Sequence, residues 1–342
     1  MTNPSSDEID LERRVLLRAL AVTGAVAQAG LLDTAARAAS VPADGFPPLQ
    51  QIDAGPLSIG YVDMGPHTAK PVILLHGWPY DIHSFAEAAP LLAKAGHRVI
   101  IPYLRGYGST VFRSADAMRN GQQAALALDV IALMDALKIP RAVLAGFDWG
   151  ARTADIVAAL WPERCLGLVS VSGYLIGSQQ ANRAPLPPKA ELAWWYQFYF
   201  ATERGRIGYE RNRHDFNKLI WQTASPQWHF DDATYERTAA SFDNPDHVAI
   251  VIHNYRWRLG LEPGEAKYDA YEQNLATAPT IPVATITMEG DANGAPHPKP
   301  EDYRARFVGR HEHRLINGGI GHNLPQEAPA AFAAAVLALA QI

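Results

Sequence analysis

Short continuous apolar runs, separated by stretches with helical spacing, dominate the chain from residue 71 onward. The runs lie at 71–76, 98–101, 142–145, 166–171 and 283–288, and the helical stretches at 84–95, 121–137 and 151–160. Apolar runs of this length are typical of strands buried on both faces. Strands that alternate with helices predict right-handed crossovers and a mostly parallel sheet covered on both sides. Two alternating segments, 49–54 and 57–64, predict an antiparallel hairpin before the parallel strands.

The segment from about residue 175 to 280 interrupts this alternation. It is rich in aromatic and charged residues, as at 194–200, and it lacks apolar runs of the strand type. We therefore expect a helical cap inserted between two strands of the sheet. The predicted organisation is a core in two parts, 40–174 and 281–342, with the cap at 175–280 between them.

The first 39 residues follow a different pattern. Arg13 and Arg14 precede an uncharged apolar stretch at 19–32, and a small-residue site follows at 36–38. A twin arginine, a short apolar region and such a site resemble a Tat export signal. Because a membrane-spanning helix needs about 20 apolar residues, we expect no stable membrane insertion. The prediction is a periplasmic or secreted protein, and the alternative is a cytoplasmic one whose first residues form an amphipathic helix.

Composition limits the classes of partner. The chain has 342 residues, of which 48% are hydrophobic, and a formal net charge of −5 without a long run of Lys and Arg. This is enough apolar material for a large core, and it excludes the basic surface that nucleic acid requires. The single cysteine, Cys165, lies in an apolar run, so we expect a buried hydrophobe. No metal-ligand spacing occurs, and nothing indicates an oligomeric state.

The stretch 143–152 is the most informative one. An apolar run ends in Gly146-Phe147-Asp148-Trp149-Gly150 and continues into a predicted helix. This is the strand, sharp turn and helix of a nucleophile elbow, in which the central side chain stands exposed above the sheet edge. That side chain is usually serine, and here it is Asp148.

Two further loops carry candidate chemistry. His76, Gly77, Trp78 and Pro79 follow a predicted strand, and the backbone N–H of Trp78 and the N–H of Trp149 would form an oxyanion hole. We expect a structural role for His76, as a hydrogen-bonding group that orients this loop. His322 follows the nucleophile late in the chain, which is the order of an elbow hydrolase.

These motifs resemble the aspartate-nucleophile branch of the α/β-hydrolase fold, which holds epoxide hydrolases and the haloalkane and haloacid dehalogenases. The resemblance covers about residues 50–342 and implies that fold, without a cofactor or a metal. Epoxide hydrolases of this branch use two cap tyrosines as proton donors, and Tyr196 and Tyr255 resemble them, with packing inside the cap as the alternative role. By the same resemblance, Arg152 matches one arginine of fluoroacid dehalogenases, but Trp149 stands where their other arginine is expected.

The chemistry of a carboxylate favours one reaction class. A carboxylate is ionised at neutral pH and displaces a leaving group from saturated carbon, which leaves an ester on the protein. His322 would then activate water against that ester. An epoxide oxygen leaves as a strong base and needs a proton donor such as a phenol, whereas a halide needs none. The sequence thus favours an epoxide hydrolase acting on a small apolar or aromatic substrate; the alternatives are a dehalogenase and a catalytically idle ligand receptor.

The group that orients His322 has two candidates. The family position, three residues after Gly290, holds Asn293, and the nearest carboxylate is Asp291. A carboxylate stabilises an imidazolium better than a neutral amide does. We therefore expect Asp291 to orient the imidazole, with Asn293 as the alternative.

Overall fold

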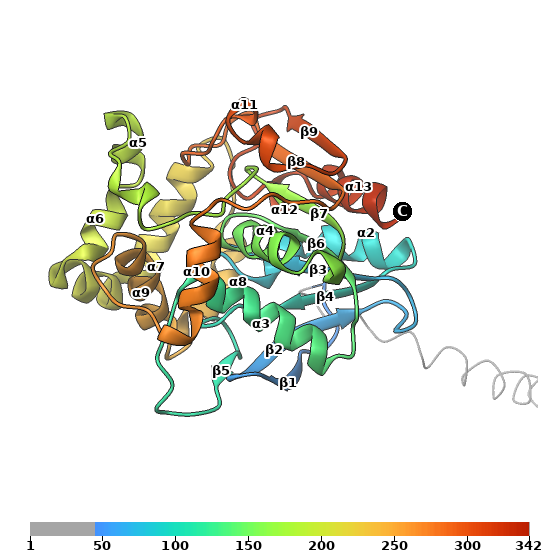
Figure 1. The fold of residues 1–342 in the computed structure, drawn as a ribbon, viewed down its shortest axis with the longest axis horizontal. Helices are drawn as coiled ribbons and strands as arrows, with labels where there is room; N and C mark the ends of the chain where they lie inside the picture. Colours follow the sequence, from blue (N-terminus) through green and yellow to red (C-terminus); the bar gives the residue numbers. More distant parts are fainter. Residues whose placement is uncertain (1–44, 342) are drawn as a thin grey trace, which may run out of the picture. The chain divides into compact units, whose positions relative to one another are not determined.

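The computed structural model describes residues 45–341, and the predicted signal segment at 1–39 lies outside this range. One nine-stranded sheet has the order β1-β2-β4-β3-β6-β7-β8-β9, with β5 paired to β2 (Figure 1). The strands are β1 (Gln50–Ala54), β2 (Leu57–Met64), β3 (Pro71–Leu75), β4 (Arg98–Pro102), β5 (Val111–Phe112), β6 (Ala142–Gly146), β7 (Cys165–Val171), β8 (Thr285–Gly290) and β9 (His311–Ile316).

The central strands pair in parallel, from β4 and β3 through β6, β7 and β8 to β9, whereas β1 and β2 pair in antiparallel fashion. β6 is buried along its whole length, and β3, β4 and β7 nearly so. This is why these strands are continuously apolar in sequence rather than alternating. The prediction of a mostly parallel sheet that begins with an antiparallel hairpin is confirmed.

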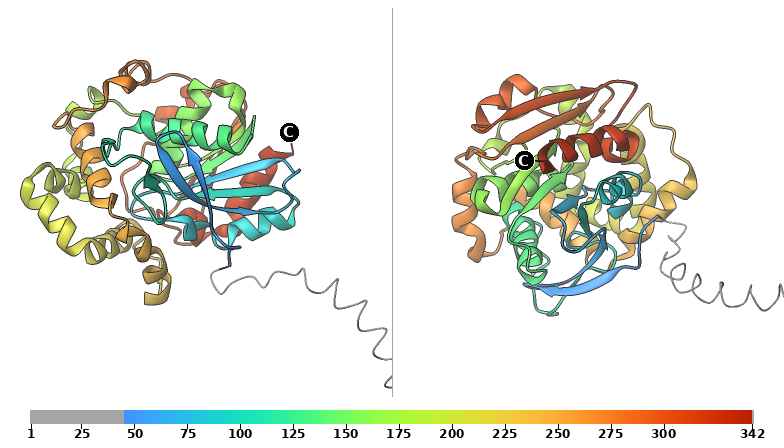
Figure 2. Two further views of the ribbon diagram at one scale, coloured as in Figure 1. Left: turned by 90° about the horizontal axis from the view of Figure 1, so that it is seen from below. Right: turned by 90° about the vertical axis from the view of Figure 1, so that its right-hand side faces the viewer.

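Helices cover both faces of the sheet (Figure 2). α3 (Gln123–Ala136) packs on α4 (Trp149–Leu160) at one face, and α2 (Ala88–Lys94) packs on α13 (Pro329–Ala340) at the other. The short α11 (Pro300–Tyr303) and α12 (Leu324–Glu327) lie in the last part of the chain. The predicted helix at 84–95 is shorter than expected, because the Asp81 side chain accepts a hydrogen bond from the His83 N–H and starts a separate 3₁₀ turn, Ile82–Phe85.

A helical insertion connects β7 to β8, as the aromatic composition of that segment predicts. It contains α5 (Pro188–Ala193), α6 (Trp195–Ala201), α7 (Glu203–Ala224), α8 (Asp232–Ala239), α9 (His247–Arg258) and α10 (Asp269–Leu275). Further 3₁₀ turns are Pro162–Arg164, Ala181–Arg183, Ala240–Asp243, Ala266–Tyr268 and Arg304–Arg306. The division of the chain into separate core and cap domains stays a prediction.

Hydrogen bonds tie the insertion to the loop that follows β3. Trp221 of α7 donates from Nε1 to the carbonyl oxygen of Pro79 at 2.7 Å. Trp78 donates from Nε1 to the Tyr209 hydroxyl of the same helix at 3.0 Å. The insertion is therefore fixed directly above the carboxyl ends of the parallel strands, where open α/β sheets bind ligands. Among residues 45–341, no helix has the length and apolar character to cross a membrane.

Candidate active site

The elbow forms where β6 passes into α4. Asp148 directly precedes α4 and has φ 51° and ψ −122°, outside the regions that residues with a Cβ favour. Neighbouring glycines make room for this turn. A Cβ on Gly150 would collide with the carbonyl oxygen of Leu75, and a Cβ on Gly77 would collide with Asp148 itself. The prediction of a strained turn that exposes Asp148 at the end of the strand is confirmed.

The two carboxylate oxygens of Asp148 have different neighbours. Oδ1 accepts a hydrogen bond from the Trp78 backbone N–H at 2.8 Å, and Oδ2 lies 3.5 Å from Nε2 of His322. Burial by itself would raise the pKa of the Asp148 carboxyl, but His322, Arg152 and the Trp78 N–H hold it below its usual value. Asp148 is therefore ionised at neutral pH, as a nucleophile must be.

His322 is held in one tautomer by Asn293. The Asn293 Oδ1 accepts a hydrogen bond from the Ala295 backbone N–H at 2.9 Å, which fixes the orientation of the amide. The same oxygen lies 3.2 Å from Nδ1 of His322, so Nδ1 carries the proton and Nε2 faces Asp148. Burial by itself would lower the pKa of His322, but the Asp148 carboxylate raises it above its usual value.

The prediction that Asp291 orients His322 is wrong. The Asp291 carboxylate accepts hydrogen bonds from the backbone N–H groups of Gly318, Gly319 and Ile320 at 2.9–3.0 Å. These bonds close the loop that follows β9, and they also lower the pKa of the Asp291 carboxyl. A single carboxylate saturated by this loop does not reach the imidazole, and the alternative candidate, Asn293, contacts it instead.

Sequence reasoning missed Glu289, at the end of β8. Its Oε1 accepts hydrogen bonds from Asn293 Nδ2 at 2.8 Å and from the Gly290 backbone N–H at 3.0 Å. The Glu289 side chain is buried, and its charge also raises the pKa of His322. A carboxylate thus supports the imidazole through an amide. The signal in the sequence was a glutamate at the end of a buried strand, four residues before Asn293.

His76 is placed as predicted for a structural residue. Its Nε2 accepts a hydrogen bond from the Leu104 backbone N–H at 3.1 Å, so Nδ1 carries the proton and donates to the Gly77 carbonyl oxygen at 3.0 Å. Burial lowers the pKa of His76 to about 4, which keeps it neutral. Cys165 is buried as predicted, and burial raises the pKa of its thiol.

The two tryptophans assigned to the oxyanion hole differ in what the structure shows. The Trp78 N–H contacts Asp148 as described above, whereas a contact from the Trp149 N–H stays a prediction. Trp149 is 1% exposed and is not part of the pocket wall. The Trp78 indole lines the pocket, but its Nε1 is bonded to the Tyr209 hydroxyl, and the Trp149 Nε1 is buried without a hydrogen-bond partner within residues 45–341.

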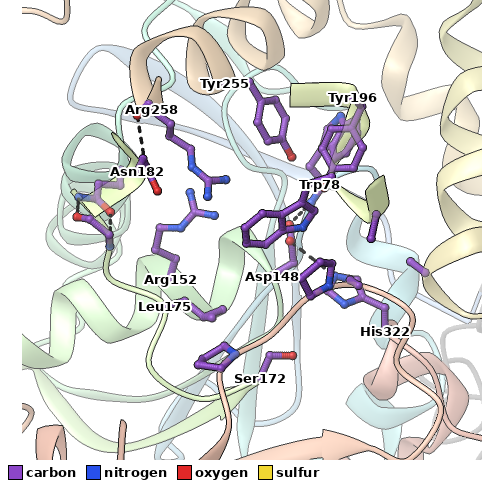
Figure 3. A pocket seen from close by; sticks show the side chains of 18 of the residues that line it. Trp78, Asp148, Arg152, Ser172, Leu175, Asn182, Tyr196, Tyr255, Arg258 and His322 are labelled. Carbon is purple, nitrogen blue, oxygen red and sulfur yellow. Dashed lines mark hydrogen bonds and ion pairs between the residues drawn. The ribbon is translucent and has the colours of Figure 1, made fainter. Parts of the chain in front are cut away.

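Tyr196 of α6 and Tyr255 of α9 lie together above Asp148. Their ring centroids are 5.4 Å apart in an edge-to-face arrangement, and both rings contact the Trp78 indole. Figure 3 shows the Tyr255 hydroxyl pointing down toward Asp148. Burial, and secondarily the Asp148 charge, raise the pKa of the Tyr196 phenol well above its usual value; burial also raises the pKa of the Tyr255 phenol. Both phenols therefore stay protonated and able to donate.

These groups share one cavity of about 280 Å³. Its walls are formed by the core residues Trp78, Asp148 and His322, the segment 172–178 that follows β7, and helices α6 and α9. The volume is at the small end of ligand pockets, which are about 300–1,000 Å³. Arg152 of α4 and Arg258 of α9 also project into the cavity (Figure 3).

Comparison with known proteins identifies the fold. A family model described as the alpha/beta hydrolase fold matches residues 70–208. A crystal structure of a Klebsiella pneumoniae protein, proposed to be an epoxide hydrolase, is 65% identical, with a TM-score of 0.87, over 88% of this chain and 100% of that one. The chain belongs to the α/β-hydrolase fold family.

Curated relatives of this α/β hydrolase include two proteins of Mycobacterium tuberculosis. Epoxide hydrolase B is 39% identical over 149 residues, which are 40% of this chain and 41% of that protein. The chain thus matches about two fifths of the length of that relative. Epoxide hydrolase A is 25% identical over 320 residues, which are 86% of this chain and 97% of that protein.

Proposed function

We propose that this α/β hydrolase is an epoxide hydrolase, which opens an epoxide to a diol through a covalent ester on Asp148. One observation carries the proposal. An ionised carboxylate, with one oxygen on a backbone N–H and the other beside a histidine, lies beneath two protonated phenols. The relatives named epoxide hydrolases support the same substrate class.

In the first half-reaction, Oδ2 of Asp148 attacks one epoxide carbon, and the bond from that carbon to the epoxide oxygen breaks. The oxygen takes a proton from the Tyr255 or Tyr196 phenol, because an alkoxide is a stronger base than a phenolate. Oδ1 becomes the ester carbonyl oxygen and keeps the hydrogen bond from the Trp78 N–H. The products are an alkyl ester and a phenolate.

In the second half-reaction, Nε2 of His322 takes one proton from water as the water oxygen adds to the ester carbonyl carbon. Collapse of the tetrahedral intermediate breaks the bond to the diol oxygen, which takes the proton from His322. The remaining water proton passes from the Asp148 carboxyl to the phenolate, and the enzyme is restored. Water has entered, and no oxidant or cofactor takes part.

The ester explains how a histidine with a raised pKa can act as a base. In the free enzyme the Asp148 carboxylate favours the imidazolium form of His322. Esterification removes that negative charge, so the pKa of His322 falls when the ester forms. The imidazole is then neutral at the step that requires a proton acceptor.

The two indole N–H groups favour an epoxide over a haloalkane. A leaving halide is stabilised by N–H donors that point into the pocket. Here the Trp78 Nε1 is bonded to Tyr209, and Trp149 does not line the cavity. Phenols, which an epoxide needs and a halide does not, take the position above Asp148.

Single-turnover reaction in oxygen-18 water tests this route. With enzyme in excess over an epoxide such as styrene oxide, we expect the diol to contain no label and the peptide containing Asp148 to gain it. Mass spectrometry of both products makes the measurement. Label that appears in the diol during the first turnover would show direct attack by water and would contradict the ester mechanism.

A further inference from the structure

The pocket contains two arginines that the ester mechanism does not use. Arg152 lies on α4, four residues after the nucleophile, and Arg258 is the last residue of α9. Figure 3 shows both guanidinium groups pointing into the cavity and toward each other. Burial and the charge of Arg258 lower the pKa of Arg152 to about 10, so Arg152 remains charged at neutral pH and is repelled by the Arg258 guanidinium.

Within residues 45–341, neither guanidinium has a hydrogen bond or an ion pair with another protein group. Arg258 only faces the rings of Trp194 and Tyr255, at 5.8 and 5.7 Å from their centroids. Outside the pocket, Arg105 is paired with Asp129 at 2.6 Å and Arg98 with Asp63 at 2.7 Å. Half-buried Arg237 on α8 also lacks a side-chain partner within residues 45–341. The pocket differs in holding two such arginines that face each other.

The carboxyls near Arg152 are engaged elsewhere. Glu272 accepts hydrogen bonds from Gln123 Nε2 and the Ala124 N–H at 2.9 and 3.0 Å. Asp155 accepts one from the Leu175 N–H at 2.8 Å, and burial raises its pKa to about 8, so it is largely uncharged at neutral pH. Asp148 is held by the groups described above. None of the three forms a hydrogen bond or ion pair with Arg152 within residues 45–341, and Asp148 and Glu272 act on it only through their charge.

The charge of the cavity wall follows from its ionisable residues. Besides His322, the charged groups of the wall are two arginines and one aspartate, Asp148, so the wall has a net positive charge in a chain whose formal net charge is −5. Leaving two cations unpaired in a partly dehydrated cavity is unfavourable. An anion bound between the two arginines would offset this cost. Without the arginines, the Asp148 carboxylate would repel such an anion.

We propose that the substrate is an epoxide that carries a carboxylate group, and that Arg152 and Arg258 bind this carboxylate. The inference rests on the proposed epoxide hydrolase function and names the substrate class. A guanidinium binds a carboxylate through two parallel N–H···O bonds. One arginine comes from the core and one from the insertion, so the substrate is held from both sides while its epoxide lies between Asp148 and the two phenols.

A different role for Arg152 makes a different prediction. Its charge lowers the pKa of Asp148, so Arg152 would keep the nucleophile ionised even without an anionic substrate. In that case its loss would slow charged and uncharged epoxides equally. The charge of Arg258 lowers the pKa of both phenols, so a purely electrostatic role of Arg258 would likewise change the rates for charged and uncharged epoxides alike.

The test compares 3-phenylglycidate with its neutral amide, 3-phenylglycidamide, as substrates of the full-length enzyme. We expect kcat/KM for the acid to exceed that for the amide by about 10²-fold, since hydrogen bonds to charged groups are strong. Arg258→Gln should raise KM for the acid about tenfold to hundredfold and change that for the amide by less than about twofold. Arg258→Lys should restore part of the loss, and Arg211→Gln, at an exposed site on α7, is the matched control.

Binding of unreactive ligands gives a second measurement that does not depend on turnover. By calorimetry, 3-phenylpropanoate should bind tighter than 3-phenylpropanamide, and Arg258→Gln should abolish the difference. Equal efficiency with acid and amide in the wild type would overturn the carboxylate site and leave epoxide hydrolysis standing. Preferential binding of the acid without turnover of any epoxide would overturn the proposed function and leave the site standing.

Discussion

The two sides of the pocket differ in how their polar groups are satisfied. On the core side, the Asp148 carboxylate is held by Trp78 and His322, and the imidazole is held in turn by Asn293 and Glu289. On the insertion side, no hydrogen bond or ion pair within residues 45–341 engages the Arg258 guanidinium. The reacting groups of the core are thus organised before substrate arrives, whereas Arg258 of the insertion, like Arg152 of α4, is left for a substrate to pair.

This difference separates chemistry from recognition. Reacting groups must be fixed to within fractions of an ångström, and networks of hydrogen bonds provide that. Groups that select a substrate give the highest selectivity when their hydrogen-bond partner is the substrate itself. A molecule that cannot form the hydrogen bond leaves a buried polar group unpaired and therefore binds more weakly. The following variants test this division, from the largest expected effect to the smallest.

Loss of His322 should have the largest effect and should separate the two half-reactions. In His322→Gln we expect kcat to fall about 10⁴-fold, at the upper end of general-base contributions, while the alkyl ester still forms. Intact-protein mass spectrometry after mixing with epoxide should show the mass of one added substrate. A variant that stays unmodified but loses turnover would show that the imidazole is also needed for attack, and would remove the distinction between the two steps.

Loss of a phenol should affect attack and leave ester hydrolysis intact. Tyr255→Phe and Tyr196→Phe should each lower the rate of ester formation about 10²-fold, since a general acid contributes that much. Stopped-flow measurement of Trp fluorescence in a single turnover follows this step. Tyr199→Phe is the matched control, because Tyr199 lies on the same helix as Tyr196 and stacks on Phe216 outside the pocket. An unchanged rate of ester formation in both Tyr255→Phe and Tyr196→Phe would show that these tyrosines only pack within the insertion.

Replacement of the amide that orients the imidazole should have a smaller effect. In Asn293→Ala we expect kcat to fall about tenfold to hundredfold, because a misplaced base costs up to about 10²-fold. Asp291→Asn should change kcat by less than about twofold, as substitutions remote from the chemistry do. Steady-state kinetics of both variants makes the comparison. A larger loss in Asp291→Asn than in Asn293→Ala would contradict the geometry described above.

Asp155 of α4, which does not line the pocket, should affect stability and not turnover. Burial raises its pKa to about 8, so the folded state keeps a proton that the unfolded chain releases above pH 4. The free energy of unfolding therefore falls as pH rises from about 4 to about 8. Asp155→Asn should remove this fall and be more stable than the wild type at pH 8 by several kcal/mol, since each pKa unit corresponds to about 1.4 kcal/mol.

Urea unfolding of both proteins at pH 5 and pH 8 measures the effect on stability. Asp135→Asn is the control, because Asp135 is exposed and paired with Arg164 at the surface. If the difference between the wild type and Asp155→Asn is the same at both pH values, Asp155 is ionised in the folded protein. An ionised Asp155 would be an available partner for Arg152, which would weaken the argument for a carboxylate substrate.

The features that could be predicted from the sequence are those determined by residues close together in the chain. The apolar runs and the glycines around Asp148 identified the sheet and the elbow, because burial on both faces and a strained turn each limit the residues allowed at one position. Tyr196 and Tyr255 were recognised only by resemblance. That both line the pocket and that their rings touch depends on how α6 and α9 pack, which periodicity does not reveal.

The orienting group shows where such reasoning fails. The spacing of the resembling family pointed to Asn293, but charge favoured Asp291, the nearest carboxylate. The structure places the Asp291 carboxylate on three loop N–H groups and puts Glu289 behind Asn293. Hydrogen-bond donors from a loop almost thirty residues away decided the outcome, and such long-range pairing leaves no mark in the local pattern.

By itself, the sequence determined the fold class, the elbow and the identity of the candidate nucleophile and base, since each depends on neighbours close in the chain. Only the tertiary structure decided which side chain supports His322 and which cations remain unpaired. An arginine is recognisable in any sequence, but its lack of a partner is a property of all the groups around it. Arg152 and Arg258 lie more than a hundred residues apart, and packing of the insertion on the core places both in one cavity.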